Sequence, residues 1–136
     1  MPLSDCRLID AIRIVDSRGS LAVLEVGNHV PFVIQRAYYL YDVPEGAERG
    51  GHAHKALHQV FIAVSGAFDL VLRDGVSTRR IRLDSPHQAC YVGPMVWREL
   101  EAFSEGAVCL VLASAPYDES DYYRDLEDYL QVVRQQ

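Results

Sequence analysis

Two histidines one residue apart, His52 and His54, are the residues of this sequence best suited to chemistry. They lie in the segment RGGHAHKALHQVFIAVSG at 49–66, between a glycine pair and an apolar run. On an extended backbone, residues two apart project from the same face, roughly 6.6 Å apart along the strand. Two imidazoles on one face predict either a metal site or an acid–base pair, because imidazole binds metals and titrates near neutral pH.

A metal site would need further ligands, and His58 is the nearest histidine in the sequence. On a continuous strand His58 lies roughly 13 Å beyond His54, whereas metal–ligand bonds are near about 2 Å. The acid–base pair is therefore the favoured interpretation. A bend in the chain keeps the metal alternative open, and a pair of solvated histidines on a surface strand is the third possibility.

A second set of polar side chains lies on the strand expected at 31–41. Alternation places Arg36 and Tyr38 on one face, together with apolar side chains. An arginine and a tyrosine among inward-facing apolar residues predict a pocket for a polar ligand. Tyr39 and Tyr41 fall on the other face, where we expect them to pack.

The rest of the sequence has the pattern of an all-β protein. The run VFIAV at 60–64 is apolar at every position, which is typical of a strand buried on both faces. Short strands separated by turn residues predict a β-sandwich or barrel. The other expected strands lie at 8–14, 21–26, 31–41, 67–73, 76–83, 90–92, 95–100 and 107–114.

The last part of the chain has a different period. From 117 to 133, aromatic and aliphatic residues fall at 122, 123, 126, 129, 130 and 133, the spacing of an amphipathic helix. Asp118 or Ser120 could cap this helix. We expect it to pack on the barrel exterior or on a second subunit, and we expect a structural role for this acidic, tyrosine-rich tail.

Length and composition exclude some classes of function. The 136 residues predict one domain, and the net charge of −6 gives no electrostatic basis for binding nucleic acid. No apolar stretch approaches the roughly 20 residues of a membrane helix, and the N-terminus lacks a signal pattern. Cys6, Cys90 and Cys109 are expected to be buried, reduced thiols of a cytoplasmic protein.

The histidine segment resembles the first motif of the cupin superfamily, in which HxH is followed by a glutamate, an apolar run and a glycine. Here His52 and His54 are followed by Gln59 at the place of the glutamate. The segment GPMVWR at 93–98 resembles the second motif, with Arg98 at the place of its histidine. Because two of the usual metal ligands are absent, the resemblance implies an all-β cupin jelly-roll barrel that has lost its metal site.

A more specific resemblance covers nearly the whole chain. It implies that residues 1–136 form one cupin domain with a C-terminal α-helix, a sugar 3,4-ketoisomerase that needs no cofactor. Such enzymes convert dTDP-4-keto-6-deoxyglucose into its 3-keto isomer, on the route to 3-amino-3,6-dideoxy sugars. Its relatives are homodimers, some with exchanged N-terminal strands, so a homodimer is expected. Six segments in the same order carry the resemblance: DSRGSL at 16–21, PFVIQRAYYLYDV at 31–43, RGGHAHK at 49–55, LDSP at 83–86, YVGPMVW at 91–97 and ASAPYDESDYYRD at 113–125.

The chemistry of this isomerisation suits the histidines. Moving a carbonyl from C4 to C3 requires removal of the C3 proton, formation of an enediol and protonation of C4, without a redox cofactor or a metal. Histidine can act as either acid or base near neutral pH. His52 and His54 are therefore assigned as the proton-transferring pair, with His52 preferred, and their separate roles stay open.

The resemblance also implies ligand contacts elsewhere. Arg18, in the turn DSRGS, is similar to the family's diphosphate-binding arginine. In such a site Arg36 is expected to contact a phosphate, and Tyr38 the sugar or its enediolate. Gln59 and Arg98 are expected to line the pocket, and Trp97 is expected either to stack on the base or sugar or to pack in the core. Two alternatives are a 3,5-epimerase of the same keto-sugar and a non-catalytic cupin that binds a nucleotide sugar. The C4 configuration of the product and the choice between dTDP and UDP stay open.

Overall fold

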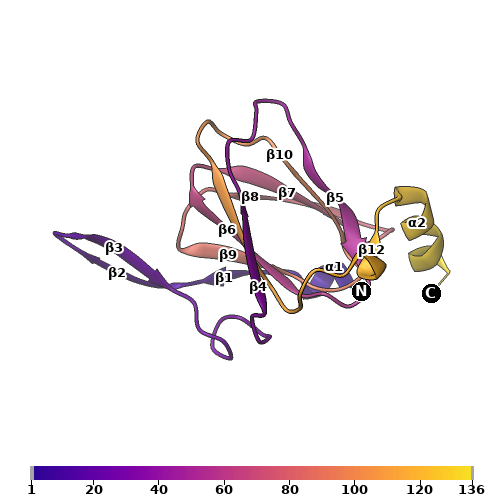
Figure 1. The fold of residues 1–136 in the computed structure, drawn as a ribbon, viewed down its shortest axis with the longest axis horizontal. Helices are drawn as coiled ribbons and strands as arrows, with labels where there is room; N and C mark the ends of the chain where they lie inside the picture. The colour runs from indigo at the N-terminus through magenta and orange to yellow at the C-terminus, as the bar shows by residue number, and fades with distance from the viewer. Residues whose placement is uncertain (1, 136) are drawn as a thin grey trace.

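The computed structural model describes residues 2–135, which form two antiparallel five-stranded sheets and a separate hairpin (Figure 1). One sheet has the strand order β1-β9-β6-β11-β4 and the other the order β12-β5-β10-β7-β8. The hairpin consists of β2 and β3. The elements in chain order are α1 (Pro2–Asp5), β1 (Arg7–Asp10), β2 (Ile12–Asp16), β3 (Gly19–Val23), β4 (Arg36–Leu40), β5 (Arg49–His54), β6 (Gln59–Ser65), β7 (Phe68–Arg73), β8 (Thr78–Leu83), β9 (Gln88–Val92), β10 (Trp97–Glu101), β11 (Val108–Ala113), the 3-10 helix η1 (Glu119–Asp121), β12 (Tyr122–Tyr123) and α2 (Leu126–Arg134).

The core lies between the two sheets and is built from alternate positions of their strands. In β6, Phe61 and Ala63 belong to this core, whereas Val60 and Ile62 belong to a second apolar cluster. Apolar side chains from the segment at 24–34 pack against that second cluster. The prediction of a strand buried on both faces is therefore confirmed for all of the run at 60–64 except its last residue.

The N-terminal strands are shorter than predicted. The strand expected at 8–14 is interrupted at Ala11, because β1 pairs with β9 whereas β2 pairs with β3. The chain therefore leaves the sheet, and the hairpin of β2 and β3 projects away from the body (Figure 1). The strand expected at 31–41 is regular sheet only from Arg36, because Phe32 and Ile34 cover the second apolar cluster. Gln35 makes one backbone hydrogen bond to Ala113 of β11, at 2.9 Å.

The C-terminal helix begins later than its periodicity predicted. The helix α2 starts after Asp125, whose side chain accepts a hydrogen bond from the backbone N–H of Asp128. The preceding residues form η1 and β12, and β12 pairs with β5. In α2, Tyr129 is fully buried and packs with Trp97 against the sheet. The predicted packing of a helix on the barrel exterior is thus confirmed, and no helix within 2–135 is long and apolar enough to cross a membrane.

A β-bulge in β5 sets the direction of the two histidines. The ladder pairs His52 with Arg98 and Gly50 with Glu99, which leaves Gly51 as the extra residue. Gly50 and Gly51 have φ values of 84° and 69°, a region that favours glycine. The glycine pair therefore fixes the register in which His52 lies directly across from Arg98.

Alanine at the two glycines is expected to have unequal effects on stability. Gly51→Ala lowers the free energy of unfolding by roughly 1–2 kcal/mol, the cost of the left-handed conformation alone, because a Cβ there has nothing within 4 Å. Gly50→Ala lowers it further, because its Cβ would lie 3.0 Å from Leu100 and 3.1 Å from the Arg98 carbonyl. Urea unfolding of both variants measures the difference, and an equal loss would contradict the bulge geometry.

Candidate active site

A cavity of about 490 Å3 is lined by residues from both sheets and from the C-terminal segment. Four guanidinium groups and a single carboxylate line it, which makes it suited to an anion although the chain as a whole has a net charge of −6. The polar lining residues are Arg36, Tyr38, Glu48, Arg49, His52, Arg98, Tyr122 and Arg124.

The structure brings four of the eight predicted site residues to the wall of this cavity. Arg36 and Tyr38 share the inward face of β4 with apolar core residues, as predicted. His52 and Arg98 line the cavity from neighbouring strands. Gln59 is fully buried directly behind Tyr38 and Arg98 and hydrogen-bonds to both.

The hydrogen bonds of Arg98, Gln59 and Tyr38 run in one direction. Arg98 is only a donor, so its Nη1 group fixes the Oε1 atom of Gln59 as the acceptor. The amide Nε2 of Gln59 then donates to the Tyr38 hydroxyl oxygen at 2.9 Å. Because that oxygen is occupied as an acceptor, the hydroxyl proton of Tyr38 is free to donate. Burial raises the pKa of Tyr38, so the hydroxyl keeps this proton at neutral pH.

Arg98 carries a positive charge in the interior. Its side chain is 0% exposed, and its hydrogen-bond partners are neutral. Nη1 donates to Gln59, and Nη2 donates to the carbonyls of Gly93 and Val96, at 3.3 and 2.9 Å. Burial lowers the pKa of Arg98 to about 10, which leaves the guanidinium protonated at pH 7. A buried cation without a carboxylate is costly, and an anion in the cavity would compensate it.

His52 is held neutral by this environment. Burial and then the positive charge of Arg98 lower the pKa of His52 to about 4. Within the described residues, neither of its ring nitrogens has a hydrogen-bond partner, although both are buried. A neutral imidazole with unpaired nitrogens at a cavity wall is suited to accept a proton.

His54 lies behind His52 and contacts a carboxylate that the sequence analysis missed. Its ring is 1% exposed, and its Nδ1 lies 3.0 Å from Oδ2 of Asp121. Burial, followed by the charge of Arg98, lowers the pKa of His54 to about 2. His54 lines a second, smaller cavity of about 180 Å3, whereas His52 lines the large one. The ring of Tyr122 contacts both histidines, with centroid distances of 4.9 and 4.3 Å.

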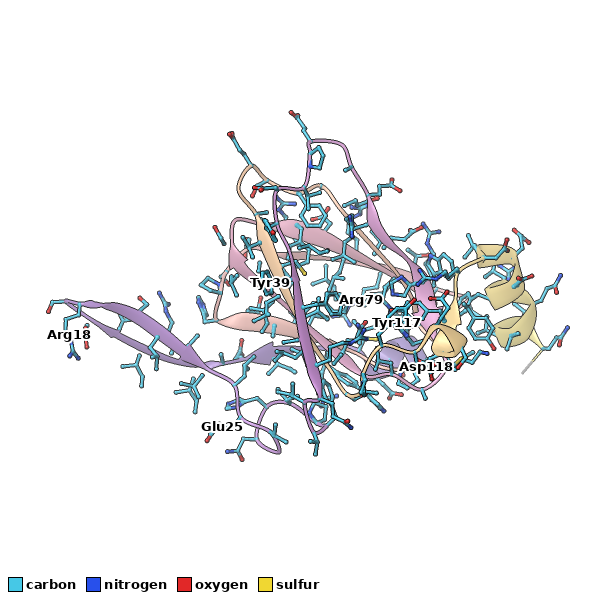
Figure 2. The ribbon with its side chains drawn as sticks, in the orientation of Figure 1. Arg18, Glu25, Tyr39, Arg79, Tyr117 and Asp118 are labelled. Atoms are coloured by element: carbon cyan, nitrogen blue, oxygen red, sulfur yellow. The ribbon has the colours of Figure 1, made fainter. Side chains whose placement is uncertain are left out.

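Besides Gln59, which lies behind the cavity wall, two predicted contact residues do not line the cavity. Trp97 packs against Tyr129, with ring centroids 5.6 Å apart, because it alternates with Arg98 and so faces α2. Of the two roles expected for Trp97, stacking on the ligand or packing in the core, this position is that of a core residue. Arg18 lies at the tip of the β2–β3 hairpin, far from the cavity of its own chain (Figure 2), and its side chain is 89% exposed.

The tail at 117–124 contributes more than the structural role expected of it. Tyr122 and Arg124 line the cavity, and Asp121 contacts His54. Arg124 forms a two-bond ion pair with Glu119, at 2.6 and 2.8 Å, and lies 4.1 Å above the Tyr122 ring. The available signal was that 117–124 is rich in tyrosine and acidic residues but lacks the helical spacing of apolar residues, which is regular only from 126 onward.

The three-histidine metal arrangement is not formed. The Nδ1 of His58 lies 2.6 Å from the hydroxyl of Tyr91, a residue of the second apolar cluster. Gln59, not His58, projects inward to Arg98. Among residues 2–135, no group of three or more histidine, cysteine, aspartate or glutamate side chains is placed to hold a metal ion.

Two antiparallel sheets around a polar cavity, with an HxH strand opposite the strand that follows a glycine–proline turn, define a cupin-type barrel. The chain belongs to the FdtA family, described as WxcM-like, C-terminal, whose match spans residues 4–134. It is 42% identical over 127 residues to the TDP-4-oxo-6-deoxy-alpha-D-glucose-3,4-oxoisomerase of Aneurinibacillus thermoaerophilus, covering 93% of this chain and 91% of that protein. The family predicted from the six sequence segments is confirmed.

Solved structures give the same result. QdtA, a sugar 3,4-ketoisomerase from Thermoanaerobacterium thermosaccharolyticum solved with TDP, has a TM-score of 0.94 and 40% identity, covering 98% of this chain and 97% of its own. A 3,4-ketoisomerase from Helicobacter canadensis has a TM-score of 0.92 and 42% identity, with coverage of 96% and 98%. Two sugar epimerases, at 21% and 18% identity, share the fold alone.

The lowered histidine pKa values predict a pH-dependent stability. Below pH 6.5 the unfolded chain takes up protons at His52 and His54, while the folded chain holds them neutral down to about pH 4 and about pH 2. The free energy of unfolding therefore falls as the pH is lowered from 6.5 toward 4, by up to about 1.4 kcal/mol per pH unit for each histidine. Urea unfolding at several pH values should show a shallower slope for His52→Asn, and an unchanged slope would contradict the buried neutral state.

Proposed function

We propose that this protein is a sugar 3,4-ketoisomerase that converts dTDP-4-keto-6-deoxyglucose into a dTDP-3-keto-6-deoxyhexose. The observation that carries the proposal is the neutral His52 facing Arg98 across the ladder at the wall of an arginine-lined cavity. A base and an electrostatic stabiliser are thus adjacent. Family membership and 42% identity to an oxoisomerase of this type support the same reaction.

His52 is the base that removes the proton from C3. Its neutral imidazole accepts that proton, and the C3–H bonding electrons form the C3=C4 double bond while the C4 carbonyl oxygen becomes an enediolate oxygen. The proton of the C3 hydroxyl then passes to the enediolate oxygen on C4, O3 forms the new carbonyl, and the C3=C4 electrons take a proton onto C4 from the His52 imidazolium. The base is restored, and the sugar is isomerised without a change in its overall oxidation state.

Tyr38 and Arg98 stabilise the enediolate. The Tyr38 hydroxyl proton is left free by the Arg98–Gln59–Tyr38 hydrogen bonds, so it can donate to an oxygen that becomes negative. The charge of Arg98 acts in a dry interior, where electrostatic stabilisation of a transition state is strong. Gln59 is a positioning residue, because it acts by orienting Tyr38.

The remaining arginines bind the nucleotide diphosphate. Arg36, Arg49 and Arg124 line the cavity, and guanidinium groups suit phosphate oxygens. Arg36 lies over the rings of Tyr38 and Tyr117 at 5.3 and 6.0 Å, and its Nε is buried without a partner within the described residues. Three cationic side chains around one opening favour a ligand with more than one negative charge.

Replacement of His52 is expected to abolish turnover without abolishing binding. His52→Asn lowers kcat by roughly 10²–10⁴-fold, the usual contribution of an acid–base residue, and retains affinity for the dTDP-sugar. Proton NMR with dTDP-4-keto-6-deoxyglucose in D₂O measures conversion and isotope position. The wild type should give a 3-keto sugar with deuterium at C4, because the proton taken up by His52 is expected to exchange with D₂O before the imidazolium returns one to the sugar. His87→Asn is a matched control in the turn before β9, outside the cavity, and should behave as wild type.

Other outcomes would select the alternatives. Deuterium at C3 and C5 with inverted centres would establish an epimerase. Saturable binding without any exchange in the wild type would establish a non-catalytic binding protein. The coupling constants of the product give the configuration at C4.

The protein is further proposed to act as a homodimer with exchanged N-terminal hairpins. Ile14 and Leu21 pair across the hairpin, and each is 54% exposed. An isolated two-stranded hairpin is only marginally stable in water, so these side chains need a surface to cover. Tyr39 lies on the edge strand β4 and Tyr41 directly follows it. Both were expected to pack, and both are more than half exposed. We assign this strand of a second copy as the surface that receives the hairpin.

The exchange would explain the position of Arg18. Within one chain this arginine is far from the cavity, yet β4 carries Arg36 and Tyr38 on its inward face. A hairpin lying along the partner's β4 brings Arg18 to the mouth of the partner's cavity, where it can bind the diphosphate.

The three free, buried cysteines support the cytoplasm as the location.

Mixing two weakly active variants tests this exchange. Arg18→Ala and His52→Asn are each expected to be weakly active alone. If Arg18 serves the partner's cavity, a heterodimer of the two variants holds one complete site, and random reassortment restores roughly a quarter of the wild-type sites. Steady-state activity after co-refolding measures the recovery. Arg18→Ala mixed with itself is the control, and an absence of recovery would show that Arg18 does not act across the dimer.

A further inference from the structure

The contacts of Asp121 define the protonation pattern of His54. The two oxygens of this carboxylate have separate partners: Oδ1 accepts the backbone N–H of Ala56 at 2.9 Å, and Oδ2 lies 3.0 Å from Nδ1 of His54. The Asp121 carbonyl also accepts the N–H of Lys55 at 2.8 Å. Three contacts, two through the carboxylate and one through the backbone carbonyl, therefore hold Asp121 against the end of β5. A carboxylate only accepts hydrogen bonds, so the proton between them belongs to Nδ1.

The other nitrogen of His54, Nε2, is consequently unprotonated and carries a lone pair in the interior. Nε2 is buried and has no hydrogen-bond partner among residues 2–135. The His54 ring meets the His52 ring edge to face, with centroids 4.8 Å apart and an interplanar angle of 88°. A neutral imidazole with its proton on Nδ1 and its lone pair on Nε2 is a dipole, and this ring lies in contact with the group that becomes positive when it takes the substrate proton.

We propose that Asp121 is a positioning residue that holds His54 as the Nδ1–H tautomer, so that the dipole of His54 stabilises the His52 imidazolium formed during isomerisation. The role rests on the proposed function. His52 needs such a neighbour because the fixed charge of Arg98 opposes its protonation from across the ladder. The tautomer is set from outside the sheet, by a residue of η1 that the sequence pattern did not single out.

Asparagine at 121 reverses the tautomer while keeping the side-chain shape. The amide oxygen of Asp121→Asn accepts the N–H of Ala56, so its NH₂ group faces His54 and makes Nδ1 the acceptor. The proton then moves to Nε2, and the dipole of the His54 ring reverses. We expect kcat to fall roughly 10- to 100-fold, as for other residues that orient an active-site histidine, with KM unchanged because the effect arises only when His52 is charged.

Long-range ¹⁵N–¹H NMR of the full-length protein with ¹⁵N-labelled histidine reads the tautomer directly and without substrate. The wild type should show His54 protonated at Nδ1, and Asp121→Asn should show it protonated at Nε2. Asp118→Asn is the matched control, because Asp118 caps the same short helix through Ser120 and does not contact His54. This variant should keep the wild-type tautomer and kcat. Asp121→Glu, which retains a carboxylate, should restore part of kcat.

Three results would overturn the proposal. These are an Nε2–H tautomer in the wild type, an unchanged tautomer in Asp121→Asn, or a reversed tautomer with wild-type kcat. If Asp121→Asn does not fold, the tautomer of the wild type and the partial rescue by Asp121→Glu decide the question. Absence of turnover in the wild type would refute the ketoisomerase and the catalytic part of the role, while the wild-type tautomer would still test the positioning.

Discussion

The buried charge of Arg98 is the constraint on which the rest of the site depends. A guanidinium group without a carboxylate partner can be tolerated in the interior only when several acceptors surround it. The turn at 93–96 supplies two backbone carbonyls and Gln59 supplies an amide oxygen. Together with burial, which has the larger effect, the same charge lowers the histidine pKa values, and through Gln59 it orients Tyr38. One cation thereby connects the protonation state of the base to the stabilisation of the intermediate.

The surrounding fold keeps this charge in place. The bulge at Gly50 and Gly51 puts His52 directly across from Arg98. On the other side of the sheet, the Tyr129 hydroxyl lies 2.9 Å from the Met95 carbonyl, and the Met95 N–H donates to the His54 carbonyl at 2.7 Å. The helix α2 thus contacts the turn that supplies acceptors to Arg98. Contacts between residues distant in sequence therefore hold Arg98, its acceptors and the histidine strand in one arrangement.

The sequence predicted the parts of the site that lie on regular strands. Alternation correctly placed Arg36 and Tyr38 on one inward face, because strand geometry projects alternate side chains to opposite sides. The same alternation on β10 directs Trp97 away from Arg98, but the stacking prediction for Trp97 did not use it. Asp121 could not be predicted, since its contact with His54 joins residues 67 positions apart through an irregular segment. The role of Arg18 stays a prediction, because its exposed side chain lies at the hairpin tip, away from the cavity of its own chain.

The central claim is that the buried positive charge and low exposure keep His52 neutral, so that it can act as a base. An NMR titration of the histidine ring signals in the unliganded protein, with His52 assigned by comparison with His52→Asn, measures this directly. The account predicts that His52 stays neutral as the pH is lowered and titrates with a pKa of about 4. A His52 that titrates at or above the ordinary value of about 6.5 would contradict it.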